Sequence, residues 1–550
     1  MDAFDLLGPL PDRATTTVLE ASAGTGKTYA LAGLVTRYVA EGVATLDEML
    51  LITFSRAATR ELRERVRAQL VKTVAALADP SEDDDDLIRH LAAAEPGELV
   101  QRRARLRDAL SDFDAATIAT THEFCGLVLR SLGIAGDTDS GAQLVESLDD
   151  LVGEIVSDLY LTTYGDQRDE PALSFAEALD LAKRVVGDPG AQLRPVTADP
   201  DSVAAQRLSF ARAVLEELER RKRRLGVLSF DDLLSRLATA LEEPDAPARD
   251  RMRRRWPIVM VDEFQDTDPV QWQVISRAFV GHSAVVLIGD PKQAIYAFRG
   301  GDIVTYLDAA RSADQRLTLA ENWRSDKVLV DRLQTVLKGA ALGDDDIVVH
   351  PVEARTDRHR LTGAPRNDPF RLRVVARTEF GTPQRRMVPI GQLRPYIARD
   401  LAADISVLLA SGAQFDGRPL TAGDIAVIVD SGLDAIPCRD ALLDLGIPVV
   451  YSGDTDVFAS TAAAEWLRLL DAFDTPNRSG VVRAAATTMF FGHRAADLAA
   501  GGDELTDQIT TTVRQWAGLA RDRGIAAVFE AVVSSGLPER VLGHRGGERH

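Results

Sequence analysis

The sequence predicts an α/β protein, with parallel sheets that are covered by helices and interrupted by helical insertions. Two observations lead to this fold class. Short apolar runs with strand character alternate with helical stretches at the start of the chain, and the alternation resumes after residue 257. Between these regions, residues 126–226 show no comparable strand. Strands that alternate with helices are typical of a parallel sheet, because each parallel neighbour requires a long crossover connection.

Five apolar runs are predicted to be the strands of a first sheet: Thr17–Glu20, Met49–Thr53, Thr117–Thr120, Ile258–Val261 and Ala284–Ile288. The intervening residues 126–226 are rich in Leu, Ala, Arg and Glu, which favours a helical insertion. We therefore expect a first sheet domain in residues 1–125 and 227–324, with the insertion between its two parts.

A second α/β pattern follows residue 324. Two apolar runs, Ile425–Val429 and Pro448–Tyr451, are predicted to be strands separated by a helix-like stretch. Residues 325–475 are therefore expected to form the first part of a second sheet domain. The pattern becomes helical over residues 476–550 and stops without a closing element, so we expect this segment to be the truncated start of a second helical insertion.

The composition excludes several classes of protein. A chain of 550 residues is too long for one hydrophobic core, and its apolar runs are too short to cross a bilayer. The N-terminus has no signal-peptide pattern, so the sequence predicts a cytoplasmic protein with no membrane partner. The two cysteines, Cys125 and Cys438, are too few for a disulfide framework or a four-cysteine metal site, and we expect both to be reduced structural thiols.

The net charge of −20 argues against a protein that grips nucleic acid with its whole surface. It leaves open a groove in which the local field and base stacking matter more than the overall charge. Any contact with nucleic acid is therefore expected to be confined to such a groove.

The strongest local signal follows the first predicted strand, where a loop of small residues leads into a helix that begins near Thr28. Small residues let backbone N–H groups approach phosphate oxygens, and the helix N-terminus favours negative charge. In such a phosphate loop Lys27 reaches the outer phosphates, and the Thr28 hydroxyl is a magnesium ligand. An ordinary strand-to-helix turn would explain neither residue. The predicted nucleotide-binding residues are Ala21, Ser22, Ala23, Gly24, Thr25, Gly26, Lys27 and Thr28, with alanine where a first glycine is usual.

Two consecutive acids, Asp262 and Glu263, follow the apolar strand Ile258–Val261. Asp262 is predicted to hold magnesium, directly or through water, and Glu263 to polarise the water that attacks the nucleotide. An acidic turn at a strand end is the alternative. It becomes the weaker interpretation because a phosphate loop precedes these acids in the same sheet domain.

These motifs and three further segments resemble the UvrD-like helicases of superfamily 1. The segments Asp262–Asp266, Ile288–Gly300 and Glu321–Ser325 are similar to motifs II, III and IV and follow the order of the family. Leu51–Arg65 and Thr120–Cys125 are similar to motifs Ia and Ib. The resemblance implies a P-loop NTPase with RecA-like sheet domains, which uses ATP and Mg²⁺ to move along DNA.

The resemblance also implies roles for single residues. Gln293 and Arg324 match positions at the γ-phosphate and complete a catalytic set with Lys27, Asp262 and Glu263. The predicted DNA-binding residues are Thr53, Phe54, Thr121, His122, Tyr296, Phe298 and Arg299. The aromatic residues among them would stack on bases of any sequence, although each alone would also suit a protein core. His122 is open to a purely structural interpretation as well.

Within the superfamily the chain looks like the RecB family. It has no glutamine just upstream of the phosphate loop, unlike the repair helicases and the AddA type, and Phe4–Leu10 and Gly423–Val429 match the RecB pattern. The resemblance implies a 3′-to-5′ helicase subunit that holds single-stranded DNA behind a duplex end. It also implies RecC-like and RecD-like partner subunits and a role in double-strand break repair and recombination.

Motifs V and VI and the RecB nuclease residues have no counterpart in the chain. We therefore expect the chain to stop before them and to hydrolyse ATP poorly by itself, because the transition state would lack a second arginine. Two alternatives stay open at this point. One is a nucleotide-gated DNA-binding or scaffold protein without ATP turnover, and the other is a helicase of the AddA type.

Overall fold

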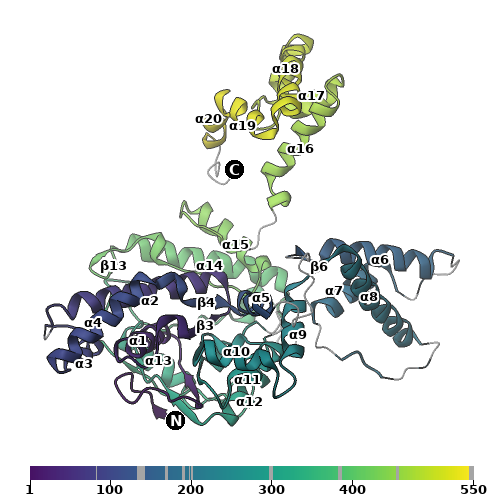
Figure 1. Ribbon diagram of the computed structural model, residues 1–550. Coiled ribbons are helices and arrows are strands. Elements are labelled where there is room, and N and C mark those ends of the chain that lie inside the picture. The colour runs from purple at the N-terminus through teal and green to yellow at the C-terminus, as the bar shows by residue number, and fades with distance from the viewer. Residues whose placement is uncertain are drawn as a thin grey trace. The chain divides into compact units, whose positions relative to one another are not determined.

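The computed structural model describes residues 1–543 except 82, 133–142, 146, 167–170, 172, 189–191, 197–198, 200–201, 297–300, 382–386 and 454–456. The chain divides into two compact units. Figure 1 labels most of the helices and several strands that belong to them. One unit comprises Met1–Val374 and Gln414–Arg418, and the other comprises Val375–Ala413 and Pro419–His550. No helix in the described part of the chain combines the length and the apolar character that a membrane span requires.

The first unit is built on a seven-stranded sheet with the order β1-β9-β2-β8-β7-β3-β4, in which every pair is parallel. The strands are β1 (Asp2–Ala3), β2 (Thr16–Glu20), β3 (Met49–Thr53), β4 (Thr117–Thr120), β7 (Ile258–Val261), β8 (Ala284–Gly289) and β9 (Gln315–Thr318). All five strands predicted from the sequence are confirmed to within one residue at each end. The other two strands, β1 at the edge of the sheet and β9 between β1 and β2, were not predicted, since they are short and largely polar.

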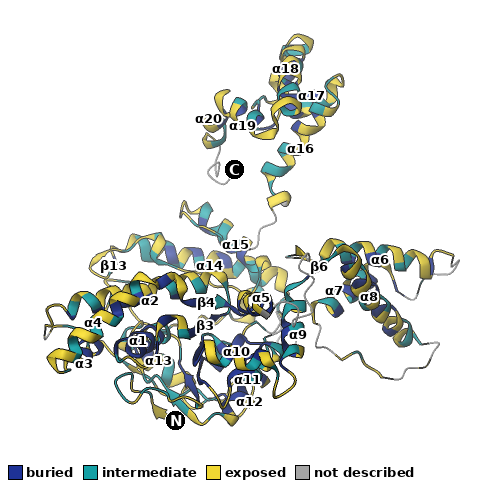
Figure 2. Ribbon diagram, viewed as in Figure 1, coloured by how far each residue is buried: buried dark blue, intermediate teal, exposed yellow. Residues whose placement is uncertain are grey.

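Helices cover both faces of this sheet, as a parallel sheet requires. One face carries α1 (Lys27–Ala40), α2 (Arg56–Ala76), α3 (Asp86–Ala92) and α4 (Pro96–Ser111), and the other carries α5 (Thr121–Leu132), α9 (Phe230–Ala240), α10 (Pro247–Arg255), α11 (Pro269–Phe279) and α12 (Ile303–Ser312). Successive strand residues alternate between the two cores: Leu51 packs with the first set of helices, and Leu50 and Ile52 pack with the second. The inner strands β2, β3, β7 and β8 and most of α1 are accordingly deeply buried (Figure 2).

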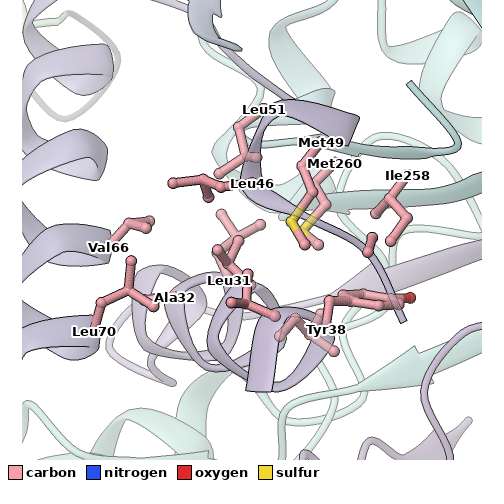
Figure 3. Packing of buried hydrophobic residues seen from close by; sticks show 14 of the residues in the cluster. Leu31, Ala32, Tyr38, Leu46, Met49, Leu51, Val66, Leu70, Ile258 and Met260 are labelled. Atoms are coloured by element: carbon pink, nitrogen blue, oxygen red, sulfur yellow. The ribbon is translucent and has the colours of Figure 1, made fainter. Parts of the chain in front are cut away.

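Figure 3 shows the core between the sheet and α1. Met49 and Leu51 of β3 and Met260 of β7 point toward Leu31 and Tyr38 of α1. All five residues are at most 1% exposed. Because burying a large apolar side chain contributes about 1.5–3 kcal/mol, this contact fixes α1, and with it the phosphate loop, against the sheet.

The predicted insertion is helical, as expected. Its helices α6 (Asp149–Tyr164), α7 (Phe175–Gly187) and α8 (Val203–Leu225) pack around a core of their own. Two short strands, β5 (Gln143–Leu144) before α6 and β6 (Val227–Leu228) after α8, pair with each other in parallel. Helix α5 runs across the predicted boundary at residue 125 and packs in the core of the main sheet.

The remaining elements of the first unit follow the main sheet. They are β10 (Glu321–Asn322), α13 (Lys327–Leu337), β11 (Glu353–Ala354), β12 (Leu361–Thr362), β13 (Gln414–Phe415) and the strand β14 (Arg418–Pro419), which reaches the boundary of the unit. The second unit contains α14 (Ile390–Ala410), α15 (Gly432–Asp444), α16 (Thr461–Asp474), α17 (Ser479–Ala486), α18 (Ala495–Arg523), α19 (Ile525–Ser534) and α20 (Leu537–Leu542).

The two strands predicted in the second unit are not formed. Residues 425–429 and 448–451 are assigned to no strand, and Ile428 and Val450 are 94% and 92% exposed. Apolar character favours a strand, but a strand also requires a neighbour for its N–H and C=O groups. No described segment forms a ladder with either run, so the prediction from periodicity is wrong for both.

Candidate nucleotide and DNA site

Most of the candidate residues collect at the carboxyl edge of the main sheet. The phosphate loop follows β2, Asp262 and Glu263 follow β7, and Gln293 follows β8. Parallel strands end at the same edge, which explains how segments more than 200 residues apart meet here.

The loop between β2 and α1, the candidate phosphate loop, contains two glycines with positive φ. Gly24 and Gly26 adopt φ values of 81° and 88°, in the left-handed region that glycine tolerates best. Gly26 is the N-cap of α1, and its carbonyl accepts a hydrogen bond from Ala30 N at 2.9 Å. Ala21 N donates to Gly289 O at 3.0 Å and so anchors the start of the loop to β8. The free N–H groups at the start of α1 therefore face a loop that can cradle phosphate.

Lys27 and Glu263 form an ion pair, with 2.5 Å between Lys27 Nζ and Glu263 Oε2. Gln265 Nε2 donates to the same carboxylate oxygen at 2.9 Å. The backbone of Glu263 has φ 50°, a left-handed conformation that costs a non-glycine residue about 1–3 kcal/mol. Strain of this kind clusters at functional sites. In this conformation the predicted base, Glu263, contacts Lys27.

The carboxylate of Asp262 lies in a strongly negative environment. Burial, and after it the charge of Glu263, raise its pKa to about 6, whereas Lys27 opposes the shift. Burial and Glu263 likewise raise the pKa of Asp266 to about 6. The charge of Glu263 therefore makes the charged form of both aspartates less favourable.

The donor set fits magnesium. Thr28 and Asp262, the predicted ligands, carry the hard oxygen atoms that this ion prefers and would hold it. No group of three metal-binding His, Cys, Asp or Glu side chains occurs among the residues that the structure describes. Magnesium commonly takes only one or two protein carboxylates and completes its octahedron with water and substrate phosphate, so this sparse set suits a nucleotide-bound ion.

Gln293 is fixed by a carboxylate of its own loop. Its side-chain Nε2 donates to Asp290 Oδ2 at 2.6 Å, and Asp290 N donates to Gln265 Oε1 at 2.9 Å. Gln265 in turn contacts Glu263. The predicted γ-phosphate glutamine, Gln293, and the predicted base, Glu263, are therefore linked through two residues, Asp290 and Gln265.

Asn322 attaches Arg324 to the phosphate loop. Asn322 Nδ2 donates to Ala23 O at 3.0 Å, and its Oδ1 accepts from Arg324 N at 3.0 Å. Trp323 N donates to Gly24 O at 2.8 Å. The structure thus brings the Arg324 segment to Ala23 and Gly24 of the loop, although the two segments are about 300 positions apart in the sequence.

Trp323 is a site residue that the sequence analysis missed. Its indole is 58% exposed, and a Cβ atom added at Gly26 would lie 3.8 Å from Trp323 Cδ1. The Arg355 guanidinium lies 4.9 Å from the centre of the indole ring. The sequence shows an aromatic residue between Asn322 and Arg324. Its exposure, and the attachment of both neighbours to the loop, became visible only in the structure.

Two of the predicted DNA-stacking aromatics meet. The ring centroids of Phe54 and Tyr296 are 5.0 Å apart with an angle of 33° between the planes, and both side chains are partly exposed. Thr53 is buried at the end of β3, where its hydroxyl lies 2.5 Å from that of Thr59. Thr121 is buried at the start of α5. The other two candidates, Phe298 and Arg299, lie outside the described residues.

His122 is half-buried on α5. Its ring meets the Phe230 ring edge-on, with 5.3 Å between the centroids. Burial lowers the pKa of His122, whereas Asp231 and Asp268 oppose the shift. The neighbouring Cys125 is a buried free thiol, as predicted, and so is Cys438.

Comparisons with known proteins agree with this geometry. The family model of the UvrD/REP helicase N-terminal domain matches residues 10–314. The chain is 66% identical to the RecBCD enzyme subunit RecB of Mycolicibacterium smegmatis over 549 residues, which are 100% of this chain and 50% of that protein. It is 63% identical to RecB of Mycobacterium tuberculosis with the same coverage. It is 28% identical to RecB of Escherichia coli, over 97% of this chain and 56% of that protein. The chain therefore spans about half the length of these curated relatives.

Proposed function

Because the chain belongs to the UvrD/REP helicase family, we propose that it is the ATP-driven motor of a RecBCD-type DNA helicase. The single observation that carries the proposal is the ion pair between Lys27 and Glu263 at 2.5 Å. It joins the phosphate loop to the acid that follows β7. Asn322 bonds to both the phosphate loop and Arg324, and Gln293 is linked to Glu263 through Asp290 and Gln265.

Lys27 and Glu263 are proposed to act in sequence. The phosphates of ATP compete with Glu263 for Lys27, so ATP binding releases the Glu263 carboxylate. The carboxylate then accepts a proton from the water whose oxygen attacks the γ-phosphorus, and the bond to the β-phosphate oxygen breaks with its electron pair leaving on ADP. Magnesium, held by Thr28 and Asp262, neutralises phosphate charge when it is bound.

Gln293 and Arg324 are proposed to respond to the γ-phosphate. A side-chain amide nitrogen has two hydrogens, and Gln293 donates one of them to Asp290, so the other is available to a phosphate oxygen. The Arg324 guanidinium offsets charge in the transition state. The two residues come from different segments, so loss of the γ-phosphate would change the position of one segment relative to the other.

Trp323 is proposed to hold the base of the nucleotide. Its exposed indole lies beside Gly26, at the end of the phosphate loop, where the nucleoside part of a bound nucleotide would extend. A flat aromatic face binds a base by stacking.

Single-stranded DNA is the proposed track. Phe54 and Tyr296 offer adjacent aromatic faces at the same sheet edge, and stacking tolerates any base sequence. Movement in the 3′-to-5′ direction, action in double-strand break repair and RecC-like and RecD-like partners are proposed from the similarity to the RecB proteins. By the same similarity, residues 1–125 and 227–324 are the first motor domain, and residues 325–475 belong to the second.

DNA-stimulated ATP hydrolysis by the full-length protein tests this proposal. The wild type should hydrolyse ATP faster when single-stranded DNA is added, and Lys27→Ala should abolish the reaction by removing the phosphate-binding amine. Lys183→Ala changes an exposed lysine of α7 and serves as the matched control. Equal turnover in wild type and Lys27→Ala would refute the assigned site, and nucleotide and DNA binding without any turnover would favour a scaffold.

A further inference from the structure

A buried lysine lies below the phosphate loop between two buried carboxylates. Lys292 Nζ is 2.8 Å from Glu20 Oε1 and 2.7 Å from Asp290 Oδ1. The three side chains are 12%, 4% and 3% exposed, respectively. Within the described part of the chain, Lys292 is the only ion-pair partner of either carboxylate. Two carboxylates at this depth depend on a paired cation, because burial of an unpaired charge is costly.

The two carboxylates belong to functionally different segments. Glu20 is the last residue of β2, directly before the phosphate loop, and its backbone pairs with Gly289 at the end of β8. Asp290 follows Gly289, and its second oxygen accepts the 2.6 Å hydrogen bond from Gln293. Lys292 therefore connects the start of the phosphate loop with the residue that holds the γ-phosphate glutamine.

The contacts around Lys292 belong to a closed ring. From the start of the phosphate loop, Glu20 contacts Lys292 at 2.8 Å, and Lys292 contacts Asp290 at 2.7 Å. Asp290 then contacts Gln265 at 2.9 Å, and Gln265 contacts Glu263 at 2.9 Å. Glu263 contacts Lys27 at 2.5 Å. The third of these contacts uses the backbone N–H of Asp290. The backbone of the loop itself closes the ring from Lys27 back to Glu20. Both ends of the loop are thus held by one continuous set of polar contacts.

We propose that Lys292 is a positioning residue of the ATP site, which ties Gln293 to the strand that enters the phosphate loop and thereby sets the preference for ATP over ADP. This inference rests on the proposed function. When Lys292 holds Asp290 Oδ1, Asp290 Oδ2 stays directed at Gln293. Without the lysine, Asp290 and Glu20 repel each other, and Gln293 loses its fixed support. The α- and β-phosphates, which the loop backbone holds, are affected much less.

Nucleotide binding by the full chain tests this role. A fluorescent ATPγS analogue and the matching ADP analogue are titrated in Mg²⁺ against wild type, Lys292→Met, Lys292→Arg and Asp290→Asn. Asp290→Asn removes an acceptor oxygen while leaving the Glu20–Lys292 pair balanced, so it remains informative if Lys292→Met does not fold. Lys183→Met, on the exposed surface of α7, is the matched control for loss of a lysine.

Lys292→Met and Asp290→Asn should weaken ATPγS binding about tenfold or more, the loss expected when a hydrogen bond to a charged group is removed. ADP binding should stay within about twofold, and Lys292→Arg should recover part of the preference because it keeps the charge. An equal loss for both nucleotides with a lowered melting temperature would reduce Lys292 to a structural ion pair and overturn the inference. Unchanged binding of both nucleotides by both variants would also overturn it.

The same titration separates failure of this inference from failure of the proposed function. If wild type and Lys27→Ala bind ATPγS equally, the nucleotide site itself is misassigned, and the role of Lys292 fails with it. If Lys27→Ala loses ATPγS binding while Lys292→Met keeps the preference of the wild type, the proposed function stands and only the inference about Lys292 falls.

Discussion

Arg324 approaches Gly24 so closely that a Cβ atom added at Gly24 would lie 2.9 Å from Arg324 Cβ. The same atom would lie 3.0 Å from Asn322 Nδ2. Gly24 is therefore required both for its positive φ and for the room that its neighbours occupy. This contact places the segment after β9 directly against the proposed phosphate loop.

Gly24→Ala is expected to abolish nucleotide binding, because the new methyl group displaces Asn322 and Arg324 from the loop. The fold should survive, since the clash is confined to the sheet edge. Gly153→Ala is the matched control, because nothing lies within 4 Å of the added atom on α6. Isothermal titration with ATP checks both variants, and wild-type affinity in Gly24→Ala would contradict the contact.

Trp323→Ala is expected to weaken ATP and ADP binding alike, because the base is common to both nucleotides. Loss of one stacking partner corresponds to about 1–3 kcal/mol, and Trp323→Phe should keep most of the affinity. Nucleotide should also quench the fluorescence of the exposed Trp323 and not that of the buried Trp256. A selective loss of ATP binding in Trp323→Ala would argue against a role at the base.

Phe54→Ala and Tyr296→Ala are expected each to weaken binding of single-stranded DNA by about 1–3 kcal/mol per lost stacking contact. The loss should be the same for mixed, purine-rich and pyrimidine-rich strands, and nucleotide affinity should not change. Fluorescence anisotropy with labelled oligonucleotides measures it. Phe175→Ala on α7 removes a partly exposed aromatic residue away from the sheet edge and serves as the control. An equal loss of DNA binding in that variant would show that Phe54 and Tyr296 are not a specific DNA-binding pair.

Neither cysteine should react with a thiol reagent in the native protein. Burial raises the pKa of the Cys125 thiol and that of Cys438, so little thiolate forms at neutral pH. Addition of Ellman's reagent should release almost no colour until denaturant is added, after which both thiols react. Fast reaction of one thiol in the native protein would show that the buried environment of that cysteine opens to solvent.

The sequence was sufficient to predict the inner strands of the main sheet. Strands such as Ile258–Val261 are buried on both faces and therefore appear as continuous apolar runs. The same criterion failed for residues 425–429, because hydrophobicity reports the tendency to be buried and not the presence of a neighbouring strand. The strand Gln315–Thr318 was missed for the opposite reason, because it has a neighbouring strand on each side but little apolar character.

Single candidate residues of the site could be proposed from the sequence, but the contacts that connect them could not. The motifs identified Lys27, Glu263 and Gln293, since each follows a strand of a parallel sheet. No pattern in the sequence indicated that Lys292 pairs with Glu20, 272 positions away. Contacts of this kind depend on which strands lie side by side, and strand order is not encoded in local periodicity.

The most direct test of the proposed motor is hydrolysis by Glu263→Gln in the full-length protein with single-stranded DNA. Glutamine keeps the size of the side chain but cannot accept the proton of the attacking water. ATP and DNA should bind as in the wild type, whereas turnover should fall about 10²–10⁴-fold, the range of general base catalysis. Turnover at the wild-type rate in Glu263→Gln would contradict the assignment of the base and with it the proposed mechanism.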